Sequence, residues 1–351
     1  MRTPKDIEAL VRPNIRALCP YSTARDEYQG PLGIFLDANE SPYPTGYNRY
    51  PDPHQKALKA QISAIKGLPA ENIFLGNGSD EAIDLCFRVF CTPGADNAVA
   101  IVPSYGMYAV AADINDVPVR SVPLGPDFSL PSQALLDACN AHTKLMFLCS
   151  PNNPSGNAFD PAELEALVRD FPGIVVLDEA YADFSAKGSL RAKVLEYPNL
   201  IVLQTLSKAY GLAGLRLGMA FADAYVIRLM SMVKYPYNIN QAALELVSGA
   251  LATPVDAKVA ETVAQRGRVA AALPAYGFVR RVYPSDANFL LVQVDEPDTL
   301  YAHLLADGII VRNRSRVRGC AGCLRITIGL PSENDKLLQS LVRYDKGDIH
   351  R

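Results

Sequence analysis

The chain has 351 residues, of which 49% are hydrophobic and 20% charged, a composition typical of a globular protein with a large buried core. Its formal net charge of −3 argues against a nucleic acid or an anionic membrane surface as partner. No apolar run approaches the roughly 18 residues of a membrane-spanning helix, and the N-terminus has no apolar signal core, so a cytoplasmic location is expected.

The N-terminal part of the chain has little regular pattern. A short helix is predicted at residues 6–10, and residues 34–36 have the apolar character of a short strand. Prolines and tyrosines between residues 43 and 53 exclude regular structure there. A helix is then predicted from His54 to about Lys66, where a glycine and a proline follow.

From residue 73 to about residue 230, short apolar strands alternate with helical patterns. Uniformly apolar strands are typical of a sheet that is buried on both faces. The alternation therefore predicts an α/β fold with a mainly parallel sheet. The predicted strands are residues 73–75, 98–102, 117–122, 144–148, 174–177, 200–203 and 217–221.

After residue 235 the pattern changes to an α+β arrangement. An alanine-rich helical stretch at 240–273 contains one break, strand-like segments follow at 288–294 and 324–328, and a helix ends the chain. We therefore predict three parts: an N-terminal arm (1–35), a large domain (36–238) and a small C-terminal domain (239–351). The arm is expected to pack on the small domain or on a partner subunit.

The cysteines are scattered, and their number, seven, is odd. In a chain of this size that pattern predicts reduced thiols rather than a disulfide framework. Cys320 and Cys323 have the spacing of metal ligands, but no second pair accompanies them, and His303 is the only nearby histidine. We therefore predict no metal site, with a zinc or redox role for this pair as the less favoured alternative.

The most informative stretch follows the strand predicted at residues 200–203. Thr205 and Ser207 lie close to Lys208, and Arg216 lies eight residues after that lysine. Apolar surroundings and a nearby cation both lower the pKa of a lysine, which makes Lys208 a candidate amine nucleophile for a Schiff base. The two hydroxyls and Arg216 are suitable donors for a phosphate. The alternative is an ordinary surface lysine.

Other polar segments also follow predicted strands, and in open α/β sheets function lies beyond the carboxyl ends of the strands. A glycine-rich stretch before Ser79 and Asp80 can present N–H groups to a phosphate at a helix N-terminus, or is only a capped turn. Asn153 lies in a loop whose prolines by themselves indicate a turn. Asp178 ends an apolar strand, three residues before Tyr181, and a carboxylate there is costly unless it pairs with a cation or caps a helix.

These segments, with Tyr105 and in this order, resemble the fold-type I pyridoxal-phosphate enzymes of the aspartate aminotransferase superfamily. The shared features are Gly-Ser-Asp, the aromatic residue, Asn-Pro-x-Gly, Asp-x-x-Tyr, and Ser-Lys followed by an arginine eight residues later. The resemblance covers nearly the whole chain. It implies a large domain with a mainly parallel seven-stranded sheet between helices, and a smaller α+β domain.

The resemblance also implies pyridoxal 5'-phosphate as cofactor. Lys208 would bind the cofactor aldehyde covalently, and Asp178 would keep the pyridine nitrogen protonated. Asn153 and Tyr181 would hydrogen-bond the ring oxygen, and Tyr105 would stack on the ring. The cofactor phosphate would be held by Ser79, Asp80, Thr205, Ser207 and Arg216. It would also be reached by Tyr50 of the neighbouring subunit, which implies a homodimer with shared active sites.

Four further segments resemble one family within this superfamily, the histidinol-phosphate aminotransferases; they are residues 37–42, 49–53, 308–313 and 322–329. This resemblance implies transamination between L-histidinol phosphate and 2-oxoglutarate, in histidine biosynthesis. Arg325 and Arg312 would bind the substrate anion with help from Tyr21, and Asn39 is a further substrate-binding candidate. Arg312 lies in a basic run, so Arg314 or Arg316 is an alternative phosphate ligand.

Other members of the superfamily share the same anchor residues. They include the aromatic aminotransferases and the threonine-phosphate decarboxylases of corrinoid synthesis, and phosphate-binding arginines do not exclude the latter. A cofactor-binding regulatory module is a third alternative, which we disfavour because no DNA-binding segment precedes the domain. The loop sequence Asn-Pro-Ser-Gly also departs, conservatively, from the usual Asn-Pro-Thr-Gly.

Overall fold

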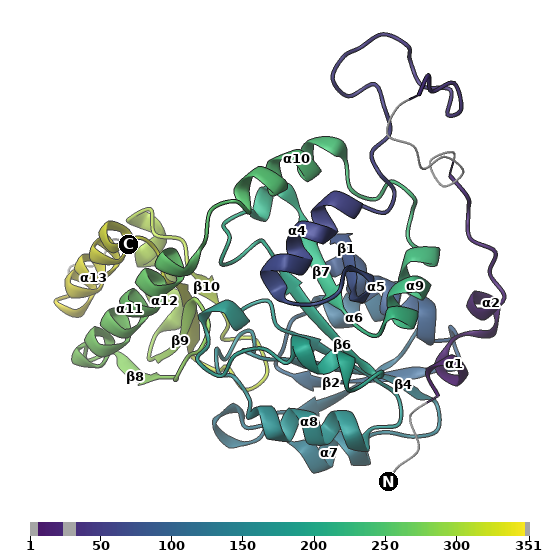
Figure 1. Ribbon diagram of the computed structural model, residues 1–351. Helices are drawn as coiled ribbons and strands as arrows, with labels where there is room; N and C mark the ends of the chain where they lie inside the picture. Colours follow the sequence, from purple (N-terminus) through teal and green to yellow (C-terminus); the bar gives the residue numbers. More distant parts are fainter. Residues whose placement is uncertain (1–5, 24–32, 348–351) are drawn as a thin grey trace.

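The computed structural model describes residues 6–23 and 33–347, which form two separate sheets (Figure 1). The larger sheet has seven strands in the spatial order β1 (Ile73–Asn77), β7 (Leu217–Phe221), β6 (Leu200–Thr205), β5 (Ile174–Asp178), β4 (Thr143–Cys149), β2 (Asn97–Val102) and β3 (Val119–Pro123). Strand β7 runs antiparallel to both of its neighbours, and the remaining pairs are parallel. The predicted mainly parallel sheet is therefore confirmed.

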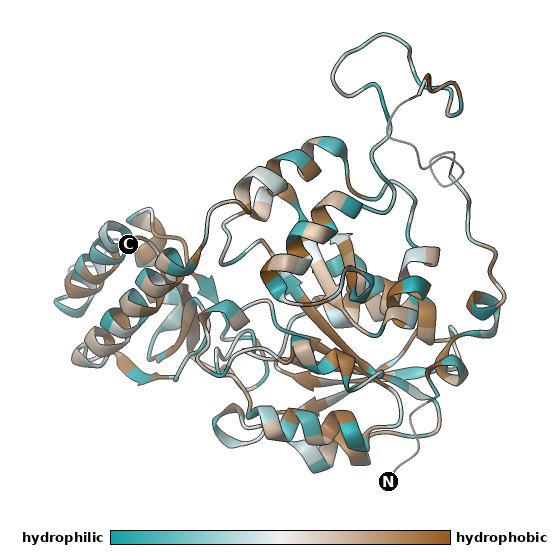
Figure 2. Ribbon diagram, in the orientation of Figure 1, coloured by the Kyte–Doolittle hydropathy of each residue, from teal (hydrophilic) through white to brown (hydrophobic). Residues whose placement is uncertain are grey.

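Alternate residues of each strand enter two different hydrophobic cores, because successive side chains of a strand point to opposite faces. In β4, Leu145 and Phe147 belong to one core, and Met146 and Leu148 to the other. The first core is covered by α5 (Ser79–Phe90), α6 (Met107–Ile114) and α9 (Ala224–Val233). The second is covered by α4 (Lys56–Lys66), α7 (Ser132–Asp137), α8 (Pro161–Asp170) and α10 (Gln241–Ala250). Figure 2 shows the resulting concentration of apolar residues on the central strands.

The smaller sheet is antiparallel, with β10 (Arg312–Asn313), β11 (Cys323–Thr327), β9 (Phe289–Val294) and β8 (Val279–Val282) in that order. One face packs against α11 (Asp256–Ala272), α12 (Pro297–Ala306) and α13 (Pro331–Asp345) through residues such as Val292 and Leu324. The opposite face carries Phe289, Leu291 and Arg325, which contact loops of the larger sheet. This second face brings β11 close to the carboxyl edge of the larger sheet.

The N-terminal helices α1 (Ile7–Leu10) and α2 (Pro13–Arg16) pack on the larger sheet's core rather than on the smaller sheet. Ile7 and Ile15 are buried there, and the amide of Arg12 donates to the carbonyl of Val89 at 3.0 Å. The expectation that this segment packs on the small domain is therefore wrong for residues 7–15. Residues 1–5 and 24–32 of the predicted arm lie outside the described residues.

The strand predicted at residues 34–36 is absent from the structure. Ile34 and Leu36 are 90% and 87% exposed and lie in an irregular segment that extends away from both sheets (Figure 1). An apolar run becomes a strand only where a neighbouring edge supplies hydrogen-bond partners, and none of the described strands lies beside this one. Among the described residues, no helix has both the length and the apolar character needed to cross a bilayer.

Candidate active site

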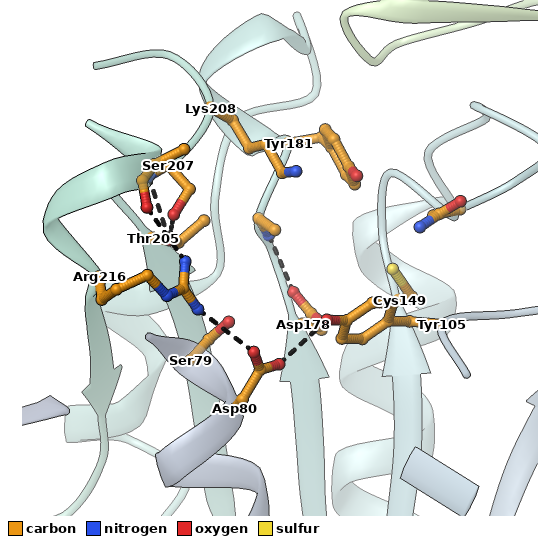
Figure 3. Close-up of a pocket in the computed structure, with 13 residues that line it drawn as sticks. Ser79, Asp80, Tyr105, Cys149, Asp178, Tyr181, Thr205, Ser207, Lys208 and Arg216 are labelled. Carbon is orange, nitrogen blue, oxygen red and sulfur yellow. Dashed lines mark hydrogen bonds and ion pairs between the residues drawn. The ribbon is translucent and has the colours of Figure 1, made fainter. Parts of the chain in front are cut away.

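A cavity of about 150 Å³ lies at the carboxyl edge of the larger sheet (Figure 3). Every residue predicted to bind the cofactor lines this cavity except Tyr50. The lining consists of Ser79, Asp80, Tyr105, Cys149, Asn153, Asp178, Ala180, Tyr181, Thr205, Ser207, Lys208, Ala213 and Arg216. The parallel strands β4, β5 and β6 end at the same edge, which is why residues far apart in the sequence meet here.

Lys208 follows β6 and directs its amine into the cavity beside Tyr181 (Figure 3). Its Nζ lies 5.5 Å from the centre of the Tyr181 ring. Although the residue remains accessible through the cavity mouth, desolvation lowers the pKa of Lys208, the positive charges of Arg325 and Arg216 lower it further, and Asp178 opposes them. A lowered pKa increases the fraction of neutral amine, the form that reacts as a nucleophile or base.

Asp178 is buried at the end of β5. Its Oδ1 accepts from the Ala180 amide at 3.0 Å, and its Oδ2 accepts from the Tyr108 hydroxyl at 2.8 Å. Burial raises the pKa of this carboxyl group, and the Tyr108 hydrogen bond opposes that rise. A buried carboxylate of this kind is stabilised by a cation placed against it, which fits the protonated ring nitrogen of a pyridine cofactor.

Asp80, at the start of α5, connects the two sides of the cavity. One carboxylate oxygen accepts from the Tyr105 hydroxyl at 3.0 Å, and the other lies 3.4 Å from Nη2 of Arg216. The neighbouring Gly78 has a φ of +81°, and a Cβ there would lie 2.5 Å from Nη2 of Arg216. Glycine is therefore required at this position for the arginine to reach the N-terminus of α5.

Hydroxyl groups from the end of β6 and from the loop after it lie beside Arg216 (Figure 3). The hydroxyl of Thr205 lies 3.0 Å from that of Ser207, and it accepts from the Ser207 amide at 3.1 Å. Gly218 allows the close approach of α5, because a Cβ there would lie 2.1 Å from the backbone nitrogen of Ser79. A guanidinium, two hydroxyls and a helix N-terminus form a donor set that fits a phosphate group.

The smaller sheet reaches the cavity through Arg325. Its Nη1 donates to Oδ1 of Asn153 at 2.6 Å, and its guanidinium lies 5.3 Å from the centre of the Phe289 ring. Phe289 in turn meets Tyr181 edge to face at 5.2 Å. Burial lowers the pKa of Arg325, and the nearby Tyr181 opposes this effect. Arg325 therefore places a cation of the smaller sheet beside a residue that lines the cavity.

Five predicted residues do not line the cavity in this structure, and one of them, Arg325, meets it only through its hydrogen bond to Asn153. Tyr50 stacks on Tyr237 with ring centres 4.4 Å apart. Tyr21 is 76% exposed, and Asn39 is exposed with a φ of 54°. Arg312 is exposed but lies directly opposite Arg325 in the β10–β11 pair.

Two polar neighbours of Asp178 were not predicted. Tyr108 lies three residues after Tyr105, a spacing that keeps two side chains near the same end of a helix. Cys149 ends β4 directly opposite Asp178 in the strand pairing, and burial raises the pKa of its thiol. The spacing of the two tyrosines was a usable signal, whereas the position of Cys149 follows only from strand register.

The sheet order and the cavity define the class of protein, a pyridoxal-phosphate-dependent aminotransferase of fold type I. The family model described as aminotransferase class I and II matches residues 38–341, and the chain belongs to this family.

Two curated relatives match almost end to end. The chain is 52% identical to the histidinol-phosphate aminotransferase of Parabacteroides distasonis over 96% of this chain and 98% of that protein. It is 49% identical to the histidinol-phosphate aminotransferase of Bacteroides fragilis over 97% and 99%.

The solved structures agree with the fold. The histidinol-phosphate aminotransferase of Clostridium acetobutylicum has a TM-score of 0.78 at 22% identity, covering 85% of this chain and 91% of that one. The enzyme of Sinorhizobium meliloti, solved in complex with pyridoxal-5'-phosphate, has a TM-score of 0.78 at 23% identity, covering 85% and 83%. The expected fold-type I architecture is thus confirmed.

Proposed function

We propose that this enzyme transfers the amino group of L-histidinol phosphate to 2-oxoglutarate, giving imidazole-acetol phosphate and glutamate, as a step of histidine biosynthesis. The observation that carries this proposal is the 52% identity to a histidinol-phosphate aminotransferase over 96% of the chain. A threonine-phosphate decarboxylase of Porphyromonas gingivalis shares the fold at only 23% identity, which supports no common substrate. Transamination of histidinol phosphate is therefore favoured over the two alternatives, decarboxylation of threonine phosphate and transamination of aromatic amino acids.

The residues of the cavity suit pyridoxal 5'-phosphate. When bound, this cofactor supplies an aldehyde and an electron-withdrawing ring that accept the amino group. Lys208 would hold the cofactor aldehyde. Its Nζ, when free as the neutral amine, would be the base that takes the proton from the substrate α-carbon, a role that requires the lowered pKa described above.

The other cavity residues would orient the ring and exclude water from it. Asp178 would pair with the ring nitrogen, and Asn153 and Tyr181 would hydrogen-bond the ring oxygen. Tyr105 would cover the ring face. The phosphate would be held by the backbone N–H groups of Ser79 and Asp80, the hydroxyls of Thr205 and Ser207, and Arg216, which are grouped around the N-terminus of α5.

Arg325 and Arg312 bind the anionic end of each substrate, assisted by Tyr21 and Asn39. The support for this role is most direct for Arg325, because its guanidinium is half-buried and donates a hydrogen bond to Asn153, which lines the cavity. The two arginines are directly opposite each other in the β10–β11 pair, so both can contact one anion.

The enzyme works as a homodimer with shared active sites. The segment 33–51 extends away from both sheets (Figure 1) and exposes apolar side chains; Tyr43 and Tyr47 are 76% and 62% exposed. Such a concentration of exposed apolar residues is typical of a surface covered by another protein. Tyr50, at the end of this segment, would reach the cofactor phosphate of the partner subunit. Asn39 belongs to the same segment, and Tyr21 is also exposed.

We also infer a cytoplasmic location and a large domain followed by a small domain, for which the sequence predicted residues 36–238 and 239–351. The separate cores of the two sheets support two domains, but α10 packs on a core of the larger sheet, which favours a boundary after this helix rather than at residue 239. The reaction itself is tested by mixing the holoenzyme with histidinol phosphate or with aromatic amino acids and following the cofactor absorbance during amino-group transfer. With histidinol phosphate, we expect a rapid change in the cofactor absorbance. Addition of 2-oxoglutarate should restore the original absorbance without release of carbon dioxide. Carbon dioxide release without a keto acid would identify a decarboxylase instead.

A further inference from the structure

Three arginines lie on one face of the smaller sheet. Arg312 pairs directly with Arg325, and the amide of Arg314 donates to the Cys323 carbonyl at 2.8 Å, which continues the same antiparallel pairing. Directly opposite residues, and residues two apart on a strand, point to the same face. The side chains of Arg312, Arg314 and Arg325 are therefore neighbours on the face that contacts Tyr181.

Arg314 has an unusual environment for an arginine in a basic run. It is half-buried, and its Nε is buried without a hydrogen-bond partner, as is Nε of Arg325. Burial lowers the pKa of Arg314, and the positive charges of Arg325 and Arg312 lower it further, while Cys320 and Tyr181 oppose them. Arg316 and Arg318, by contrast, are exposed on the following turn.

In the part of the chain that the structure describes, this group has no compensating anion. Within residues 6–23 and 33–347, no carboxylate forms an ion pair with Arg312, Arg314 or Arg325. Placing like charges together with unpaired, buried N–H groups is unfavourable unless an anion binds them. A phosphate has three terminal oxygens and two negative charges, so it can use more guanidinium donors than a carboxylate can.

We propose that Arg314 is a third arginine of the substrate phosphate site, and that it sets the preference for a phosphorylated amine over its unphosphorylated form. This inference rests on the proposed function. Within the basic run, Arg314 rather than Arg316 is then the additional residue that binds the substrate phosphate. Because Arg325 donates a hydrogen bond to Asn153, which lines the same cavity as Lys208, the phosphate site adjoins the reacting amine.

The test compares Arg314→Gln with the matched control Arg316→Gln, using histidinol phosphate and histidinol as amino donors with 2-oxoglutarate. Arg314→Gln should lower kcat/KM for histidinol phosphate by about 10- to 100-fold and change that for histidinol by less than about 3-fold. Arg316→Gln should leave both values nearly unchanged. Equal losses on both donors, or no loss on histidinol phosphate, would overturn the assignment.

Failure of the proposed function is visible separately, as absence of histidinol phosphate transamination by the wild-type enzyme. In that case calorimetric titration of the wild-type and Arg314→Gln holoenzymes with histidinol phosphate and with inorganic phosphate still decides the role of Arg314. Weaker binding of both probes by the variant supports a phosphate ligand, whereas equal binding contradicts it. Arg314→Lys keeps the charge but loses the planar donor pair, so it should recover part of the loss.

Discussion

The hydroxyl of Tyr108 donates a 2.8 Å hydrogen bond to Oδ2 of Asp178. Both residues are buried, and the Tyr108 ring is held between Phe147, on which it stacks at 5.0 Å, and the edge of Tyr105. Tyr108, which does not line the cavity, therefore fixes the direction of the carboxylate, and its hydrogen bond stabilises the ionised form against the effect of burial.

Replacing Tyr108 with Phe should weaken cofactor binding, because Asp178 loses one of its two hydrogen bonds and its pKa rises further. A hydrogen bond to a charged group contributes about 1.5–3 kcal/mol, which corresponds to roughly 10- to 100-fold in affinity. Spectrophotometric titration of the apoenzyme with pyridoxal phosphate measures this change. Tyr225→Phe, on the remote helix α9, is the control and should bind normally. Wild-type affinity in the Tyr108 variant would mean that the bond has no role in the cofactor site.

Asp178→Asn should stabilise the apoenzyme while abolishing transamination. The folded-state pKa of Asp178 is raised by burial, so its ionisation costs stability as the pH rises above about 4, its ordinary value. The melting temperature of the variant should exceed that of wild type by about 2–5 °C at pH 8, and the difference should shrink toward pH 4. The exposed Asp113→Asn is the control. A variant that is less stable than wild type at pH 8 would contradict the argument.

Arg325→Gln should raise the pKa of Lys208, since the positive charge of Arg325 is the second cause of its lowering after burial. The neutral amine would then appear at higher pH. Limited acetylation of the apoenzyme across a pH series, with Lys208 quantified by mass spectrometry, measures the midpoint. An upward shift is expected for Arg325→Gln and none for Arg228→Gln, an arginine on α9. An unchanged midpoint would show that the two charges do not interact.

Arg312 and Arg325 should differ in their effects on the two half-reactions. One bidentate arginine suffices for a carboxylate of glutamate, whereas a phosphate engages more donors. Arg325→Ala should therefore reduce kcat/KM with both histidinol phosphate and glutamate, and Arg312→Ala mainly with histidinol phosphate. Losing a charge-assisted contact of about 2–3 kcal/mol corresponds to roughly 30- to 150-fold. Small and equal losses for both variants would mean that the anion site lies elsewhere.

Tyr50 should act across the subunit interface. Tyr50→Ala and Lys208→Ala homodimers should each be inactive or nearly so, with folded structure by circular dichroism. If active sites are shared, a mixed dimer contains one site that has both intact residues. Mixing the two proteins under conditions of proven subunit exchange should then restore measurable activity. Exchange without any recovered activity would show that Tyr50 serves its own subunit.

Local sequence patterns were sufficient for the central sheet. The seven apolar runs predicted as strands are all strands, and α4 ends at Lys66 as predicted, because burial on both faces of a sheet and a glycine after a helix leave clear local signals. The helix α9 was missed, although Asp223 accepts a hydrogen bond from the Tyr225 amide at its start, a recognisable cap. Residues 34–36 were wrongly predicted as a strand, because a strand also needs a neighbouring strand that supplies hydrogen-bond partners.

The candidate site was likewise predicted only in part. The sequence by itself determined that Asp178 and Lys208 follow neighbouring apolar strands, and parallel strands end at one edge, so their proximity could be inferred. Only the tertiary structure decided that Tyr108 holds Asp178 and that Arg314, unlike Arg316, is half-buried beside Arg312 and Arg325. Those contacts join residues far apart in the chain, and they depend on helix packing and strand register, which local composition does not encode.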